Sequence, residues 1–159
     1  MQVAVIMGSG SDREQMAPAA ELLREFGIKV RSFILSAHRV PEKLEEVLRE
    51  LEEENTVCIV AGAGLSAHLP GVIASKTIIP VAGVPLDAKL GGMDALLSIV
   101  QMPKGIPVSA VGIGNAVNGA LVAVQFAAAA DPEIRKKLSA YRREMKEKFL
   151  TGNGGEIEL

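Results

Sequence analysis

Short apolar runs alternate along the chain with longer segments of helical spacing, and this alternation constrains the fold more than any other feature. Strands are predicted near residues 3–7, 29–34, 57–61, 81–84 and 108–113. A cluster of glycine, serine or proline follows each run and leads into a helical pattern, as in parallel strands joined by crossover helices. The runs are almost continuously apolar, which is typical of strands covered on both faces. The sequence therefore predicts an α/β fold with a doubly wound parallel sheet.

Six helices are predicted to connect and follow these strands. Gly27 ends the first helix, and Pro41 suits the first turn of the second. The predicted ranges are 12–26, a helix from Pro41, a helix from about Ser66, 93–100, 115–130 and 132–149. Over 116–130 the only polar side chains are Asn118 and Gln125, so apolar surface points in all directions. Because a small domain can hardly bury a helix on every side, we expect its outer face to pack on another subunit.

Composition and charge exclude several classes of protein. The chain has 159 residues, of which 48% are hydrophobic and 23% charged, and its net charge is −2. This balance is that of a globular protein and favours neither nucleic acid nor an anionic membrane as a partner. Residues 1–150 are expected to form one catalytic domain, and the glycine-rich residues 151–159 a flexible tail.

Three features of the sequence favour a cytoplasmic location. The single cysteine, Cys58, excludes an internal disulfide and lies in an apolar run, where a small core residue is expected. The N-terminus opens directly into a predicted strand without a basic leader, so no signal peptide is expected. The apolar stretch over 116–130 is shorter than the ~20 residues that a membrane-spanning helix needs.

Three unusual segments follow predicted strands, at the sheet edge where doubly wound folds bind ligands. The first contains Gly8, Ser9, Ser11 and Asp12. Its small residues and the following helix N-terminus could bind a phosphate, with the serine hydroxyls as further donors. The alternative is that Ser11 or Asp12 only caps the helix. Neither a Walker lysine nor a complete G-x-G-x-x-G is present, which disfavours nucleoside triphosphates and dinucleotides.

The other two segments contain the two histidines of the chain. His38 and Arg39 follow the second strand, where an imidazole can exchange protons and a guanidinium can hold a phosphate or carboxylate. His68 follows the glycine-rich residues 61–64. A surface loop can carry His-Arg by chance, and His68 could serve packing or a structural hydrogen bond instead. No cluster of cysteine, histidine and carboxylate has metal-ligand spacing, so no metal is expected.

Four segments together resemble the class I PurE family, whose members are N5-carboxyaminoimidazole ribonucleotide mutases. They are M-G-S-x-S-D over 7–12, S-A-H-R-x-P over 36–41, A-H-L-P-G over 67–71 and S-I-V-Q-M-P-x-G-x-P-V over 98–108. The resemblance extends from Val3 to about Tyr141. Val40 stands where the family usually has threonine, and Ser66 where it usually has alanine.

The resemblance implies a three-layer α/β/α sandwich of flavodoxin-like type and a homo-octamer. It implies an isomerase of purine (IMP) biosynthesis that moves a carboxyl group from N5 to the ring carbon of the ribonucleotide, without ATP or another cofactor. The CO2 released on the way must be confined, or it escapes before it is recaptured. Residues 62–64 and 101–107 are candidate walls, and the second segment could come from a neighbouring subunit.

The roles of single residues follow from the same resemblance. The residues expected to bind the phosphate are Ser9, Ser11 and Arg39, with Asp12 on the ribose hydroxyls. The residues expected to line the ring pocket are Ser36, Ala37, Gly64 and Leu69. His38 matches the catalytic histidine, which gives a proton to nitrogen and later removes one from carbon, and imidazole suits both tasks. His68 is placed in the pocket as a secondary residue.

Two other functions stay open. A class II enzyme would carboxylate the unmodified ribonucleotide with free CO2, although Arg39 and the segment 67–71 look like class I. The other is a non-catalytic module of the flavodoxin or response-regulator type. Ile34 and Asn115 occupy the regions where a response regulator would need its acceptor aspartate and its lysine. The chain has no tryptophan and a single tyrosine, Tyr141, so no aromatic residue is evident for stacking on a flavin.

Overall fold

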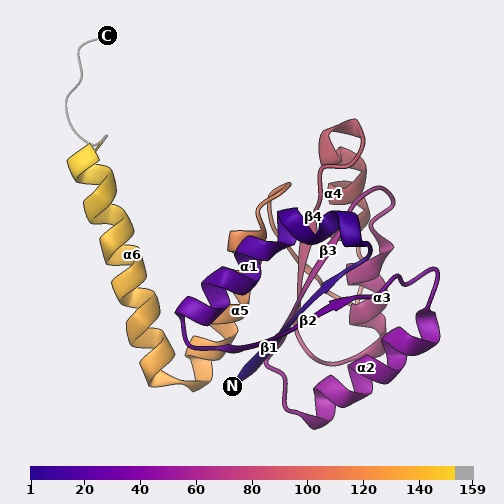
Figure 1. The fold of residues 1–159 in the computed structure, drawn as a ribbon, viewed down its shortest axis with the longest axis horizontal. Coiled ribbons are helices and arrows are strands. Elements are labelled where there is room, and N and C mark those ends of the chain that lie inside the picture. The colour runs from indigo at the N-terminus through magenta and orange to yellow at the C-terminus, as the bar shows by residue number, and fades with distance from the viewer. Residues whose placement is uncertain (153–159) are drawn as a thin grey trace.

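Five strands form one sheet in which each strand runs parallel to its neighbours (Figure 1). The computed structural model describes residues 1–152. The strands are β1 (Gln2–Met7), β2 (Lys29–Ile34), β3 (Cys58–Ala63), β4 (Val81–Pro85) and β5 (Ser109–Ala110), in the spatial order β2-β1-β3-β4-β5. All five predicted strands are present, and the doubly wound parallel sheet is confirmed.

Strand β5 is much shorter than its predicted range. It has two residues, whereas the apolar run predicted a strand over 108–113. The chain still follows β4 beyond it, because the Val111 N–H donates to the Gly83 carbonyl at 3.1 Å and the Gly114 N–H to the Pro85 carbonyl at 2.8 Å. Gly114 has a φ of 69°, which turns the backbone out of an extended path. Apolarity alone therefore predicts a strand that is too long.

The helices lie where the hydrophobic spacing predicts them. They are η1 (Gly10–Asp12), α1 (Arg13–Glu25), α2 (Pro41–Glu53), α3 (His68–Lys76), η2 (Leu90–Gly92), α4 (Met93–Val100), α5 (Ala116–Ala130) and α6 (Pro132–Gly152). Pro41 is the first residue of α2, where its missing N–H leaves no helical bond unmade. Helix α3 begins later than predicted because the Ala67 N–H first closes a turn on the Gly64 carbonyl at 3.0 Å.

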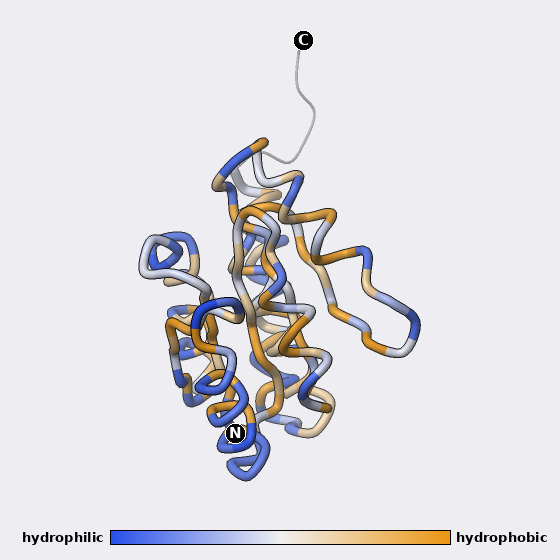
Figure 2. The backbone as a smooth tube through the Cα atoms, turned by 90° about the vertical axis from the view of Figure 1, so that its right-hand side faces the viewer, coloured by the Kyte–Doolittle hydropathy of each residue, from blue (hydrophilic) through white to orange (hydrophobic). Residues whose placement is uncertain are grey.

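Helices cover both faces of the sheet and make three layers (Figures 1 and 2). One apolar cluster joins α1, α5 and the start of α6 to one face of the sheet, for example through Val5 and Val124. A second cluster joins α2, α3 and α4 to the opposite face, for example through Ile6 and Leu48. Figure 2 shows the hydrophobic segments gathered in the middle of the molecule. The three-layer α/β/α sandwich of flavodoxin-like type is thus confirmed.

The edge of the sheet is less buried than its middle. Every residue of β1, β3 and β4 is buried, as their continuously apolar sequences predict. Strand β2 lies at the edge and is exposed or partly exposed throughout. Its Arg31 Nη1 lies 2.7 Å from Glu54 Oε2, and Nη2 lies 3.2 Å from Glu50 Oε2. Ion pairs therefore join β2 to the end of α2 and the residue that follows it.

One face of helix α5 is buried by its own chain. It packs on α1, α6, β3 and β4. A Cβ atom on Gly119 would lie 2.7 Å from Val84 Cγ2, so this glycine allows a close approach of the helix to the sheet. Ala128 is only 5% exposed. The opposite face is not covered by the described chain, since Phe126 is 40% exposed, and the packing of this outer face on a second subunit stays a prediction.

Helix α6 extends two residues past the predicted end of the domain. Thr151 and Gly152, the first residues of the expected tail, are helical. The rest of that tail, residues 153–159, lies outside the described residues. In the chain up to Gly152, no helix is both long enough and apolar enough to cross a bilayer.

Candidate active site

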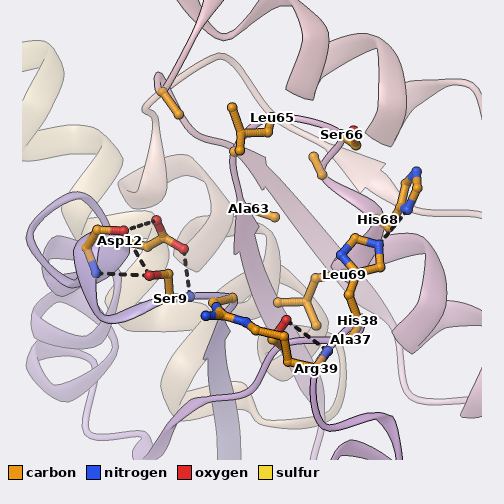
Figure 3. A pocket seen from close by; sticks show the side chains of 16 residues that line it. Ser9, Asp12, Ala37, His38, Arg39, Ala63, Leu65, Ser66, His68 and Leu69 are labelled. Atoms are coloured by element: carbon orange, nitrogen blue, oxygen red, sulfur yellow. Dashed lines mark hydrogen bonds between the residues drawn. The ribbon is translucent and has the colours of Figure 1, made fainter.

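The loops after β1, β2, β3 and β4 surround one cavity of about 530 Å³ (Figure 3). It lies at the carboxyl ends of β1 and β3, where the strand order reverses and where sheets of this kind bind ligands. All ten residues that the sequence analysis singled out line it, namely Ser9, Ser11, Asp12, Ser36, Ala37, His38, Arg39, Gly64, His68 and Leu69. Segments up to sixty residues apart in sequence thus meet at one edge of the sheet.

The turn after β1 is held by its own polar side chains. The Ser9 N–H donates to Asp12 Oδ2 at 3.0 Å, and the Ser11 N–H donates to Ser9 Oγ at 3.4 Å. The Ser11 hydroxyl lies 3.0 Å from Ser9 Oγ and 3.2 Å from Asp12 Oδ1. These contacts form a capping box at the start of η1. Capping and ligand binding are compatible here, because Ser11 is exposed, Ser9 is partly exposed and both line the cavity.

Arg39 connects the loop after β2 to the turn after β1. Its Nη2 donates to the Gly8 carbonyl at 3.0 Å, and its backbone N–H donates to Ser36 Oγ at 3.3 Å. The guanidinium therefore lies beside the Gly8–Ser9 backbone, with N–H groups left over for a ligand. A cation and two hydroxyls next to a tight turn make this end of the cavity suitable for an anion.

The two histidines face each other at the other end of the cavity. His38 Nε2 lies 2.8 Å from His68 Nδ1, and the ring centroids are 4.9 Å apart at an interplanar angle of 73°. One nitrogen must donate and the other accept, so this contact holds one proton. His38 comes from the loop after β2, and His68 is the first residue of α3. Each ring keeps a second nitrogen for other partners.

Several lining residues were not singled out from the sequence. They include Ala63, Leu65, Ala67 and Ala88. Ala88 follows β4 in a segment that carries no recognisable motif, so no sequence signal could have found it. Leu65 and Ala67 have φ values of 55° and 31°. Left-handed backbone at residues other than glycine is a feature of functional sites, but it becomes visible only in the structure.

Of the two segments predicted to wall the cavity, residues 62–64 line it in part and residues 101–107 of the described chain do not. Gly64 lines it, but Gly62 lies beneath it and packs against Met16 of α1. In the described chain, residues 101–107 do not line the cavity. Met102 instead packs on Gly71 of α3, where an added Cβ atom would lie 3.0 Å from its sulfur.

Two further observations concern metal ligands and the single cysteine of the chain. Among residues 1–152, no group of three or more His, Cys, Asp or Glu side chains is arranged to hold a metal ion. Cys58 is buried in β3, and this burial raises the pKa of its thiol to about 12. A thiol that stays protonated is a poor nucleophile, in agreement with its interpretation as a core residue.

Comparisons with known proteins agree with this geometry. A family model described as AIR carboxylase matches residues 2–148. The chain is 52% identical over 147 residues to N5-carboxyaminoimidazole ribonucleotide mutase of Pyrococcus horikoshii, covering 92% of this chain and 83% of the relative. It is 49% identical over 151 residues to the protein of the same name from Methanocaldococcus jannaschii, covering 95% and 94%. The crystal structure of Treponema denticola PurE is similar with a TM-score of 0.83 and 27% identity, covering 96% of this chain and 99% of that one. The chain therefore belongs to the AIR carboxylase family.

Proposed function

We propose that this protein is an N5-carboxyaminoimidazole ribonucleotide mutase, an isomerase of purine biosynthesis. The observation that carries the proposal is the convergence of an anion-binding end and a paired histidine in one cavity. A ribonucleotide needs both, because its phosphate must be held while protons move at its base. Relatives with about half of their residues identical bear this name, and the matching segments extend over most of the chain.

The anion-binding end would hold the ribose phosphate. Ser9 and Ser11 would donate their hydroxyls, and Arg39 would add two N–H groups in a fork that matches phosphate oxygens. Asp12 would accept hydrogen bonds from the ribose hydroxyls through the oxygen that does not cap the turn. The base would then extend toward the histidines, over the residues proposed to line the ring pocket, Ser36, Ala37, Gly64 and Leu69.

His38 would exchange the proton in both halves of the reaction. The N5–carboxyl bond breaks with its electron pair on nitrogen, which takes a proton from His38 as CO2 leaves. The ring carbon then attacks CO2 and forms a carbon–carbon bond. His38 removes the displaced ring proton and returns to its starting state, so no net proton is needed. His68 would hold the His38 ring in orientation as a secondary residue.

This mechanism is carried by the side chains of the cavity and needs neither ATP nor another cofactor. We further propose one catalytic domain over residues 1–150, a location in the cytoplasm and a homo-octamer. Exposed apolar side chains support an assembly, since Met93, Leu97 and Val100 form one stripe on α4 and Phe149 is exposed on α6. In such an assembly, residues 101–107 of one subunit would close the cavity of another.

The test is an ultraviolet assay of the interconversion of the two carboxylated ribonucleotides without ATP. The proposal expects conversion in both directions by the full chain. Its main rival, the class II carboxylase, would instead convert the unmodified ribonucleotide with bicarbonate and leave the N5-carboxylated substrate untouched. Turnover of the unmodified ribonucleotide alone would overturn the proposal in favour of that rival. Turnover of neither substrate would favour a non-catalytic module.

A further inference from the structure

Leu65 combines two features that are unfavourable for folding. Its φ of 55° lies in the left-handed region, which a leucine adopts at a cost that glycine does not have. Its side chain is also 53% exposed, so the cost is not offset by burial in the core. Strain of this kind persists only where the surroundings impose it, and it is concentrated at ligand sites.

The surroundings hold this turn firmly. The Ala67 N–H closes the turn on the Gly64 carbonyl at 3.0 Å, and the Leu86 N–H donates to the Ala63 carbonyl at 3.0 Å. A Cβ atom on Gly64 would lie 2.8 Å from the Ala88 Cβ, so the turn is pressed against the loop after β4. The position of Leu65 is therefore fixed by the end of β3, by the turn itself and by the residues that follow β4.

The Leu65 side chain belongs to the wall of the cavity. In the view of Figure 3 it stands at the end of β3, between the Ser9–Asp12 turn and the two histidines. The wall around it is largely apolar, with Ala63, Ala67 and Ala88 as further lining residues. An exposed isobutyl group at this place can be covered by a ligand that fills the cavity.

We propose that Leu65 covers the bound base and retains CO2 during the reaction, an inference that rests on the proposed mutase function. Between the breaking of the nitrogen–carbon bond and the formation of the carbon–carbon bond, CO2 is free and uncharged. Arg39 and the histidines hold it only weakly, so walls must keep it near the ring carbon. An apolar side chain that packs on the bound base excludes water and also blocks the path by which CO2 would leave the cavity. Leu65 gains its missing burial only when substrate is present.

The test measures the escape of CO2 during turnover. The full-length wild type and Leu65→Gly variant convert unlabelled N5-carboxylated substrate in buffer that contains isotopically labelled bicarbonate, and mass spectrometry gives the labelled fraction of product. We expect this fraction to rise about tenfold in the variant, the factor that burial of a leucine side chain typically contributes to an equilibrium. Decarboxylated ribonucleotide should accumulate in parallel. The thermal midpoint should stay equal or rise, because glycine relieves the left-handed strain.

Leu90 provides a matched control. It also has a positive φ, of 49°, and its side chain is 80% exposed, but it does not line the cavity. Leu90→Gly therefore removes the same strain and the same apolar group elsewhere, and its labelled fraction should equal that of the wild type. Leu65→Met restores an apolar cover of similar size, so its labelled fraction should remain within about twofold of the wild type.

The possible outcomes separate the proposals. An unchanged labelled fraction in Leu65→Gly, or an equal rise in Leu90→Gly, overturns the role of Leu65 while the mutase function stands. A lower molar mass of Leu65→Gly in light scattering, without label uptake, assigns Leu65 to a contact between copies and also overturns it. A wild type that forms no ring-carboxylated product from the N5-carboxylated substrate overturns the proposed function itself.

Discussion

His38 and His68 share a single contact of 2.8 Å, yet the proposed chemistry assigns the proton transfer to His38. His38→Asn should lower the rate constant of isomerisation by at least ~10²–10⁴-fold, the usual contribution of a positioned acid–base group. Ribonucleotide binding should stay largely intact, because the anion-binding end is untouched. Stopped-flow ultraviolet turnover and calorimetric titration measure the two effects. His68→Asn is the matched control and should lose far less; if instead His38→Asn keeps most of its activity, His68 becomes the candidate.

Arg39 provides a second prediction for a single residue. Its guanidinium already donates to the Gly8 carbonyl at 3.0 Å, which aims the remaining N–H groups. Arg39→Lys should raise KM about tenfold or more, because a point charge cannot reproduce a fork of charge-assisted hydrogen bonds. Steady-state kinetics check this value. The dephosphorylated nucleoside should bind the wild type and the variant equally poorly, and equal affinity of the wild type for nucleotide and nucleoside would contradict a phosphate site here.

Ion pairs join strand β2 to the end of helix α2, and their contribution to stability depends on pH. The Glu54 carboxylate accepts a hydrogen bond from Gln2 Nε2 at 2.7 Å and another from Arg31. The Gln2 contact, and then Arg31, lower its pKa below the ordinary value of 4.5. The pKa of Glu54 is lower in the folded than in the unfolded protein. Its ionised carboxylate therefore stabilises the fold fully above the unfolded-state pKa, and this stabilisation is lost as the pH falls through the folded-state pKa.

Glu54→Gln tests this linkage. At neutral pH the variant should have a slightly lower thermal midpoint than the wild type, since exposed pairs contribute little. The difference should shrink toward zero as the pH falls through the lowered pKa of Glu54, because the wild-type carboxylate then becomes protonated as well. Calorimetric midpoints over this range measure it. A difference that grows toward acid pH would show that Glu54 does not stabilise the fold as a carboxylate.

Helix α5 yields a prediction about a position on the face that packs against its own chain. Ala128 is buried within its own chain. Ala128→Glu should therefore lower the free energy of unfolding by about 3 kcal/mol or more, because it places an unpaired charge in the core. Its exposed neighbour provides the control, because Ala129→Glu should change stability by less than about 0.5 kcal/mol. Chemical denaturation measures both, and equal stability of the two variants would refute the burial.

At the scale of the whole molecule, helix α4 presents an exposed apolar stripe. Leu97 lies on this stripe between Met93 and Val100. Leu97→Glu should lower the molar mass in light scattering and depress activity, because a charge in an apolar contact is costly and the neighbouring residues 101–107 would leave the partner's cavity. Leu97→Met should keep the wild-type mass. A fully active monomeric wild type would contradict both the assembly and the sharing of the cavity.

The sequence predicted the parallel sheet, the order of its helices and the edge on which ligands bind. It could do so because these depend on local periodicity and on the rule that parallel strands end at the same edge. The ten proposed site residues came from short motifs, and all of them line one cavity. They lie together because each motif directly follows a strand, and the position of the strand end fixes the position of the loop after it.

Other features were decided only by the tertiary structure. They are the contact between His38 and His68, the burial of Ala128 and the strained turn at Leu65, and each depends on contacts between segments that are remote in sequence. Ala88 also lines the cavity, although no sequence motif marks it. A local pattern records which face of a helix or strand is apolar, but it does not record which element covers that face. The element that covers each apolar face is determined by tertiary packing, because only the complete arrangement decides which apolar surfaces are removed from water together.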